Sequence, residues 1–284
     1  MTRAALLATC VLATLWGGCG SDGPGASQAG VEEVDSEDLL ITVSGQAAVF
    51  PEAAQYLRAR SIDLPALDGL PVRIEEPLRV AVNDPDAPLA TGSLATDGAY
   101  RVSEVPVRNV LLSLGAGVGD GSFSGNLMHT STIVFDTALT QTRPRRDLVD
   151  TRAYVLPMRY VQALSYLVGE PRIRALSNGL LADLQETGFV LGRVVDAAGM
   201  PVAGARISAV DRPDLAGHVF YPSGDAGTLG TEATDASGLF LYVHSGGNVE
   251  TFRLAVEGAA GTYVPRNAGA ARGLGVLMMI SPKT

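Results

Sequence analysis

The sequence predicts a mainly β protein, built from two antiparallel β-sandwich units joined by a short αα-hairpin. Short runs that alternate apolar and polar residues recur along most of the chain, which is the period of a half-buried strand. Glycine and proline contribute 33 and 16 of the 284 residues and separate these runs as turn residues do. A stretch between the two sets of strands has apolar residues at helical spacing instead. We therefore divide the chain into an export signal (1–18), a flexible tether (19–38), a first β-sandwich unit (39–140), a helical hairpin (141–187) and a second β-sandwich unit (188–284).

The overall charge bears on the class of partner. The formal net charge is -9, and only 18% of the residues are charged. Proteins that bind a phosphate backbone gather Lys and Arg on one face, so we expect no nucleic-acid partner.

The N-terminus has the pattern of an export signal. Arg3 supplies a positive charge, and the apolar run Ala4–Leu15 is too short to span a bilayer. Small residues then precede Cys19, which resembles the lipobox of bacterial lipoproteins, although Trp16 stands where that family has an aliphatic residue. The resemblance implies that Cys19 is lipidated and becomes the mature N-terminus. The alternative is a plain secretory signal with cleavage a few residues later.

The rest of the N-terminal region supports an anchored, exported protein. The only other cysteine, Cys10, lies inside the signal, so no disulfide remains in the mature chain. Residues 20–39 are rich in Gly, Ser, Ala and acidic residues without apolar periodicity, which indicates a tether. Because Asp22 does not directly follow Cys19, we expect sorting to the outer membrane of a bacterial envelope.

The first unit is predicted to be a set of short strands with one short helix. The helix is expected over Pro51–Arg60, and Thr96-Asp97-Gly98 is expected to close a hairpin. The glycine-rich stretch Gly115–Gly125 is expected to be a loop. Alternation predicts strands over residues 39–45, 72–74, 78–82, 89–94, 107–114 and 130–138.

The hairpin is predicted from two helical patterns. The first helix begins at Pro157 and ends before Gly169, with Tyr166 among its regularly spaced apolar residues. The second runs over Ile173–Leu184, although Asn178-Gly179 is unfavourable inside a helix.

The second unit carries the most recognisable motif of the chain. Residues 192–205 read GRVVDAAGMPVAGA, and residues 234–240 read TDASGLF. This pattern resembles the carboxypeptidase regulatory-like domain, whose fold is a prealbumin-like (transthyretin-like) sandwich. The resemblance covers about a third of the chain and implies an accessory domain without zinc or catalysis. Strands are expected over 188–196, 206–210, 239–243, 249–257 and 274–280, with a long loop at 211–230.

The motif residues have roles that need no ligand. Asp196 and Asp235 are expected to accept hydrogen bonds from the amides of their own turns. Gly199, Gly204 and Gly238 are expected to adopt positive φ. The first unit keeps only the weaker echo Thr96-Asp97-Gly98-Ala99-Tyr100, so its membership in the family is a weaker expectation.

Catalytic and metal-binding chemistry is not predicted. The three histidines, at 129, 218 and 244, form no metal-binding motif, and no cofactor is expected. Ser122 and Ser124 lack the strand–turn–helix context of a serine hydrolase. The acidic turns at 83–86 and 211–214 lack the carboxylate spacing of an EF-hand and are expected to be ordinary Asx turns.

Aromatic residues suggest the one alternative to a purely structural role. Phe220, Tyr221 and Tyr263 are the candidate ligand contacts, because an aromatic face stacks on sugar rings; core packing is the competing interpretation. We expect a non-enzymatic, lipid-anchored cell-envelope protein with a binding or structural role. The alternative is a carbohydrate-binding or adhesion module. The expected partners are the membrane, through the lipid anchor, and a polysaccharide or envelope protein.

Overall fold

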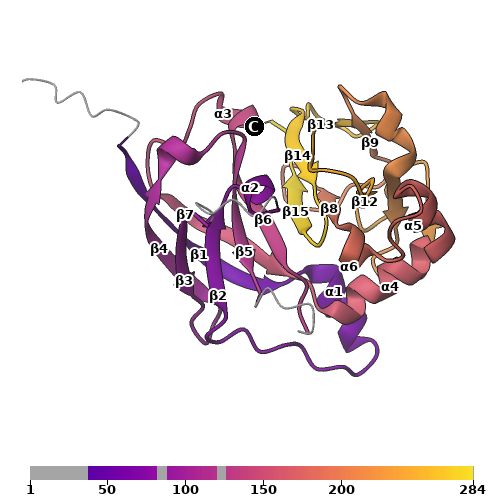
Figure 1. Ribbon diagram of the computed structural model, residues 1–284, viewed down its shortest axis with the longest axis horizontal. Coiled ribbons are helices and arrows are strands. Elements are labelled where there is room, and N and C mark those ends of the chain that lie inside the picture. Colours follow the sequence, from indigo (N-terminus) through magenta and orange to yellow (C-terminus); the bar gives the residue numbers. More distant parts are fainter. Residues whose placement is uncertain (1–37, 82–87, 120–125, 284) are drawn as a thin grey trace, which may run out of the picture. The chain divides into compact units, whose positions relative to one another are not determined.

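Strands make up most of the regular structure, which confirms the predicted mainly β class (Figure 1). The computed structural model describes residues 38–81, 88–119 and 126–283. Cys19, the export signal, nearly all of the tether, the turn at 83–86 and Ser122 and Ser124 lie outside these residues. None of the described helices is long and apolar enough to cross a membrane.

The elements follow one another in a β-rich order. Up to Val155 they are β1 (Leu40–Val49), α1 (Pro51–Arg58), β2 (Pro71–Glu75), α2 (Pro77–Ala81), β3 (Ala90–Ser93), β4 (Ala99–Pro106), the 3₁₀ turn η1 (Val107–Asn109), β5 (Ser113–Val118), β6 (Thr130–Asp136), α3 (Thr137–Thr140) and β7 (Leu148–Val155). From Met158 they are α4 (Met158–Val168), α5 (Glu170–Leu176), α6 (Leu184–Thr187), β8 (Phe189–Val194), β9 (Arg206–Ala209), η2 (Pro213–His218), β10 (Val219–Pro222), β11 (Leu229–Gly230), β12 (Leu239–Val243), β13 (Glu250–Glu257), β14 (Arg266–Ala270) and β15 (Gly275–Ile280).

One large sheet runs through both halves of the chain. Its nine described strands have the order β11-β10-β12-β8-β15-β6-β5-β2-β3. The C-terminal strand β15 joins the halves, because it pairs in parallel with β6 on one side and with β8 on the other. Two three-stranded sheets, β4-β1-β7 and β14-β13-β9, complete the described strands.

Each small sheet forms a sandwich with its own part of the large sheet. In the first half, Val43 and Val102 share a buried cluster with Ile74, Leu114 and neighbouring residues of β2 and β5. In the second half, β9, β13 and β14 share a cluster with β8, β12 and β15. The predicted pairing of strands into sandwiches follows from this burial of one apolar face of each sheet.

The helices cover the opposite face of the large sheet in the second half. Alternate residues of β12 belong to different clusters: Leu239 and Leu241 pack with residues of α4 and α5, whereas Phe240 and Tyr242 face the small sheet. Both faces of β12 are therefore buried. This explains why its five residues, LFLYV, are all apolar instead of alternating with polar residues.

The helical hairpin is present in shorter pieces than the sequence predicts. Pro157 caps α4 and Gly169 ends it, as predicted. The second helix stops at Leu176, because Asn178 and Gly179 adopt positive φ and turn the chain. Part of the segment predicted as linker, Leu148–Val155, is strand β7, which pairs in parallel with β1.

Three further expectations in the first unit are wrong. Residues Leu78–Ala81 belong to helix α2, because Pro77 occupies a first helical position and cannot donate to a sheet ladder. The start of the supposed glycine-rich loop, Gly115–Val118, is part of β5. The predicted strand at 107–114 is mostly the 3₁₀ turn and the segment that leads into β5.

The turn chemistry of the second unit is confirmed. Asp196 Oδ1 accepts hydrogen bonds from the amides of Ala198 at 2.8 Å and Met200 at 2.9 Å. Asp235 Oδ1 accepts one from the Ser237 amide at 2.8 Å. Gly199, Gly204 and Gly238 have φ of 79°, 79° and 70°, so the motif glycines serve backbone conformation.

A buried ion pair also links the two halves. Arg266 on β14 donates from Nε to Asp136 at the end of β6, at 2.6 Å, and both side chains are buried. Asp136 also accepts from the Ala138 amide, which caps α3, and from both nitrogens of Asn267. Because Asp136 is the ion-pair partner of the buried Arg266 guanidinium, its removal would leave that charge uncompensated.

Candidate functional site

The sequence-predicted aromatic residues lie in or against the core. Residues 219–222 form strand β10 inside the segment predicted as a loop, and Phe220 and Tyr221 are only 4% and 5% exposed. Their side chains belong to different clusters on the two faces of the sheet. The Tyr221 hydroxyl accepts from the Ile207 amide, and the half-buried Tyr263 donates to the Val195 carbonyl. The structure does not bring these three rings together on an open surface.

An open groove lies instead between the end of α1 and the outer face of α4. It has a volume of about 470 Å³, which is within the usual range of ligand sites of roughly 300–1,000 Å³. It is lined by Tyr56, Arg60, Ile62, Arg159, Gln162, Ala163, Tyr166 and Ala226. A second recess of about 270 Å³ adjoins it, because Ile62 and Arg159 line both.

The outer face of α4 is shaped by how the helix packs. Met158, Val161 and Leu164 are buried against the sheet, which turns Arg159 and Gln162 outward. Tyr166 is 91% exposed. The prediction that Tyr166 belongs to the buried stripe is therefore wrong, since two residues beyond Leu164 is about 200° around the helix.

The opposite wall is held in place by aromatic contacts. The Tyr56 ring meets the buried Tyr160 ring edge-on at 5.4 Å between centroids. The Arg60 guanidinium lies 3.6 Å from the centroid of the Tyr56 ring, and its Nη1 donates to the Tyr56 carbonyl. Both groups are thus oriented before any ligand arrives.

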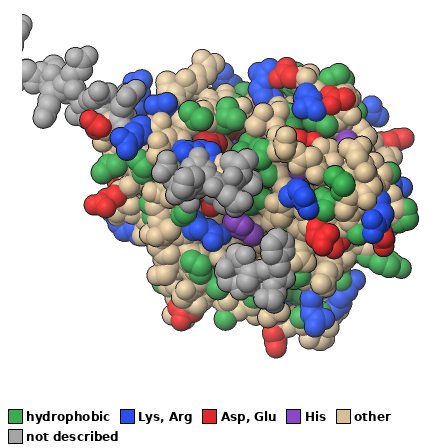
Figure 2. Space-filling model, in the orientation of Figure 1, with side chains coloured by type: hydrophobic (Ala, Val, Ile, Leu, Met, Phe, Trp, Pro, Cys, Tyr) green, Lys and Arg blue, Asp and Glu red, His purple; other side chains and the backbone are tan. Residues whose placement is uncertain are grey.

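Charge at the groove differs from the charge of the whole chain. Its described lining residues include two arginines and no acidic residue, whereas the chain carries a net charge of -9. On the face shown in Figure 2, Lys and Arg side chains are interspersed with Asp and Glu. The groove is thus a locally positive site on an acidic protein.

A second unusual feature is a polar cluster made of the buried Glu75 and Ser131 and the half-buried Arg73 and His129. It contains six of the seven buried side-chain N and O atoms without a hydrogen-bond partner among the described residues. Arg73 Nε lies 3.6 Å from Glu75 Oε2, which is an ion pair but longer than a hydrogen bond. Such unpartnered buried atoms are rare in proteins and indicate an ordered water or another bound group.

Glycines make room for this cluster. A Cβ atom at Gly117 would lie 2.6 Å from Glu75 Oε1, and one at Gly115 would lie 2.0 Å from Ser131 Oγ. The side chains of Glu75 and Ser131 can lie over β5 only because positions 115 and 117 carry no Cβ atom. Gly115 and Gly117 are two residues apart and therefore lie on the same face of a strand. This spacing is the sequence signal that distinguishes the segment from a loop.

Burial shifts the acid–base properties of the cluster. Desolvation raises the pKa of Glu75 to about 7, against the opposing effect of the Arg73 charge. Desolvation and the Arg73 charge lower the pKa of His129 to about 4. Ser131, His129 and Glu75 are the residue types of a serine-hydrolase triad, but Ser131 Oγ and His129 Nε2 have no hydrogen-bond partner among the described residues.

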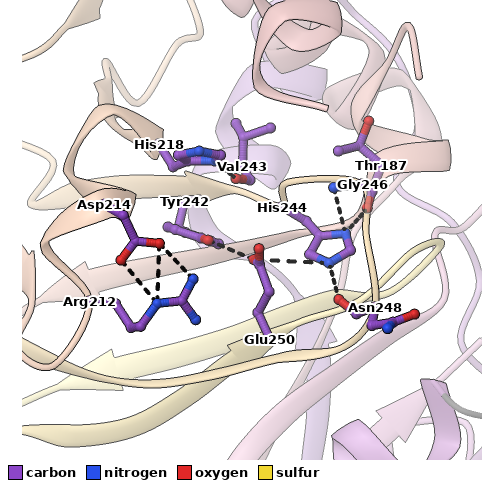
Figure 3. Close-up of polar contacts among 10 residues, drawn as sticks. All are labelled: Thr187, Arg212, Asp214, His218, Tyr242, Val243, His244, Gly246, Asn248 and Glu250. Carbon is purple, nitrogen blue, oxygen red and sulfur yellow. Dashed lines mark hydrogen bonds and ion pairs between the residues drawn. The ribbon is translucent and has the colours of Figure 1, made fainter. Parts of the chain in front are cut away.

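The other two histidines belong to a well-partnered network (Figure 3). His244 is fully buried, and its ring nitrogens face the carbonyl oxygens of Thr187 at 3.0 Å and Asn248 at 2.9 Å. The Tyr242 hydroxyl donates a hydrogen bond to Glu250 at 2.6 Å. Burial raises the pKa of Tyr242, and this hydrogen bond raises it further. The network ties the β12–β13 turn to α6 and has a structural role.

Figure 3 also shows His218 beside Tyr242 and the nearby pair Arg212–Asp214. His218 stacks on the Tyr242 ring at 5.6 Å and contacts the Val243 carbonyl through Nδ1 at 2.8 Å. The exposed pair Arg212–Asp214, in the acidic turn of the sequence, is closed on itself at 2.7 Å. Within the described ranges, no three His, Cys, Asp or Glu side chains come together as a metal-ligand set.

Comparison with known proteins adds little. No family model and no curated protein matches the sequence. Solved structures similar to the chain include a streptococcal ancillary pilin, with 13% identity and a TM-score of 0.24 over 86% of this chain and 68% of that one. The Bacillus anthracis TIE protein has 8% identity and a TM-score of 0.23, over 86% of this chain and 34% of that one. The shaft pilin SpaA from Lactobacillus rhamnosus GG has 11% identity and a TM-score of 0.21, over 86% and 98%.

Likenesses at these TM-scores carry no argument about function. The mainly β class is instead established by the strands themselves. The resemblance to the carboxypeptidase regulatory-like domain stays a prediction that rests on residues 192–205 and 234–240.

The polar cluster predicts an unusual dependence of stability on pH. Because the folded pKa of Glu75 is raised, its contribution to stability is fully present below its usual pKa of 4.5 and is lost as pH rises through about 7. Glu75→Gln removes this loss, so urea unfolding at about pH 8 should show a gain on the order of 3 kcal/mol, and at about pH 4 almost none. His129 acts in the opposite direction, since its lowered pKa costs stability as pH falls from 6.5 to about 4. The exposed Glu232→Gln is the matched control, and equal shifts at both pH values would contradict the assignment.

Proposed function

We propose that this protein is a non-catalytic binding protein, exported and anchored to the bacterial envelope through a lipid on Cys19. The apolar N-terminal run, the small residues before Cys19 and the acidic tether support export and anchoring. The folded body then faces the surroundings of the membrane, with its binding residues on the surface. We propose the outer membrane as the site of attachment, on the weaker ground that Asp22 does not directly follow Cys19.

The groove between α1 and α4 is the proposed binding site. The single observation that carries this proposal is the 91% exposed Tyr166 beside the outward-facing Arg159 and Gln162 on one wall of an open groove. Large exposed aromatic side chains beside guanidinium groups are typical of interaction sites. The rigid opposite wall, where Arg60 covers Tyr56, adds a second surface for contact.

Carbohydrate is the ligand class that the groove favours over an envelope protein. A tyrosine ring offers an apolar face to the CH groups of a sugar, while the guanidinium and amide groups beside it donate hydrogen bonds to hydroxyl oxygens. The candidates from sequence, Phe220 and Tyr221, are buried, so the proposed aromatic contact moves to Tyr166, since Arg60 covers the Tyr56 ring. Tyr263, half-buried and bonded to Val195, lies outside the groove lining.

Lipid attachment is tested by metabolic labelling. Cells that express the full chain and are fed radiolabelled palmitate should produce a labelled protein that fractionates with membranes. Cys19→Ala should abolish the label, because the acylated thiol is lost, whereas Cys10→Ala should retain it. An unlabelled parent protein, found in the soluble fraction, would show that the segment is a plain secretory signal.

Binding at the groove is tested with a glycan array and the full chain purified in detergent. Ala163→Trp places a large side chain in the groove and should abolish binding to the glycans that the unaltered protein binds. Ala198→Trp adds the same side chain to an exposed turn after β8 and should bind as the parent does. Identical array profiles for the two variants, or no glycan bound by the parent, would refute the proposed site.

A further inference from the structure

The groove also carries a specific charge pattern, from which the class of sugar follows. We infer that it binds acidic saccharides, whose rings carry carboxylate groups, in preference to neutral ones. This inference rests on the proposed function and adds the ligand class to it.

The first wall presents three complementary groups in a row. Arg159, Gln162 and Tyr166 are spaced i, i+3 and i+7, which places them along one face of α4 over about 10 Å. Their side chains make no hydrogen bond or ion pair with any residue that the structure describes. A guanidinium, an amide and an aromatic face are therefore all available to a ligand that lies along the helix.

The second wall presents a guanidinium that is already held in position. Arg60 is fixed by the Tyr56 ring at 3.6 Å and by the hydrogen bond to the Tyr56 carbonyl. An immobilised side chain loses less conformational entropy when a ligand binds. Its planar donors suit the two oxygens of a carboxylate, which a neutral hydroxyl cannot match.

The acidic side chains near this pair of arginines lie outside the groove lining. The lining contains no Asp or Glu. The nearby Asp225 is engaged by the Ser223 hydroxyl and the Gly227 amide, which, with a smaller effect of the Arg60 charge, lower its pKa. Asp63 lines the adjoining recess, not the groove itself. A ligand carboxylate thus meets two arginines, Arg60 and Arg159, whose charges no lining residue neutralises.

The other candidates on the molecule are less suited to a ligand. The Arg73–Glu75–His129–Ser131 cluster has unpartnered atoms, but Glu75 and Ser131 are fully buried. The His244 network has partners at each polar group. The groove combines open space, the exposed Tyr166 ring and a lining with a single sign of charge.

The inference is tested by calorimetric titration of the full chain with a short oligogalacturonate and with its methyl ester. Esterification removes the charge and keeps the sugar rings. We expect the acid to bind at least roughly tenfold more tightly than the ester, and Arg159→Gln to weaken the acid roughly tenfold, as loss of one charge-assisted contact does. Arg101→Gln, an exposed arginine on β4, is the matched control and should leave the affinity unchanged. Added salt should weaken binding of the acid and not of the ester.

The outcomes separate this inference from the proposed function. Equal binding of acid and ester, lost in Tyr166→Ala but unchanged in Arg159→Gln, would overturn the preference for acidic sugars and leave the groove as a saccharide site. Binding of the acid that neither variant alters would overturn the inference, since the contact would then lie elsewhere. Absence of binding by both oligomers would also overturn it, while the glycan array still decides whether the groove binds other sugars.

Discussion

The pairing of β15 with two distant strands is the constraint on which the rest of the structure depends. Its backbone bonds in parallel to Thr130–Thr132 of β6 and to Phe189–Val194 of β8, which lie in different halves of the chain. Parallel neighbours need crossover connections, so the sheet forms only when both halves and the C-terminal strand are present together. The ion pair between Asp136 and Arg266 crosses the same junction and adds a polar link to it.

The shared sheet also determines where the proposed binding groove lies. The small sheet β14-β13-β9 covers one face of β8 and β12, so the helices must cover the other, where Leu191, Leu241 and Leu277 anchor α4. With its apolar stripe used in this way, α4 presents Arg159, Gln162 and Tyr166 outward. The proposed function thus depends on the face of α4 that does not pack against the sheet. This helix lies outside the recognisable motif of the second unit.

A feature of the fold or of the groove can be predicted from the sequence where it depends on residues that are neighbours along the chain. The turns at Asp196 and Asp235, the start of α4 after Pro157 and the strand at 239–243 follow from neighbouring residues, and the sequence predicts them correctly. Features that depend on distant residues are not predicted. Gly115 and Gly117 are explained only by the side chains of Ser131 and Glu75, which come from other strands. The segment 211–230 is predicted as a loop because nothing local indicates that β12 pairs beside it. For Phe220 the competing prediction of core packing is the correct one. The groove was missed because its two walls are about a hundred residues apart.

The central claim is that the described residues fold as one cooperative unit through the nine-stranded sheet. Native-state hydrogen exchange of the full chain, followed over a series of denaturant concentrations, tests this most directly. We predict that core amides of β2 and β5 exchange with the same opening free energy as core amides of β12 and β13, because β15 couples the two halves. Protection that persists in β12 and β13 after the β2 and β5 amides have exchanged would contradict the claim and show two independently folding sandwiches.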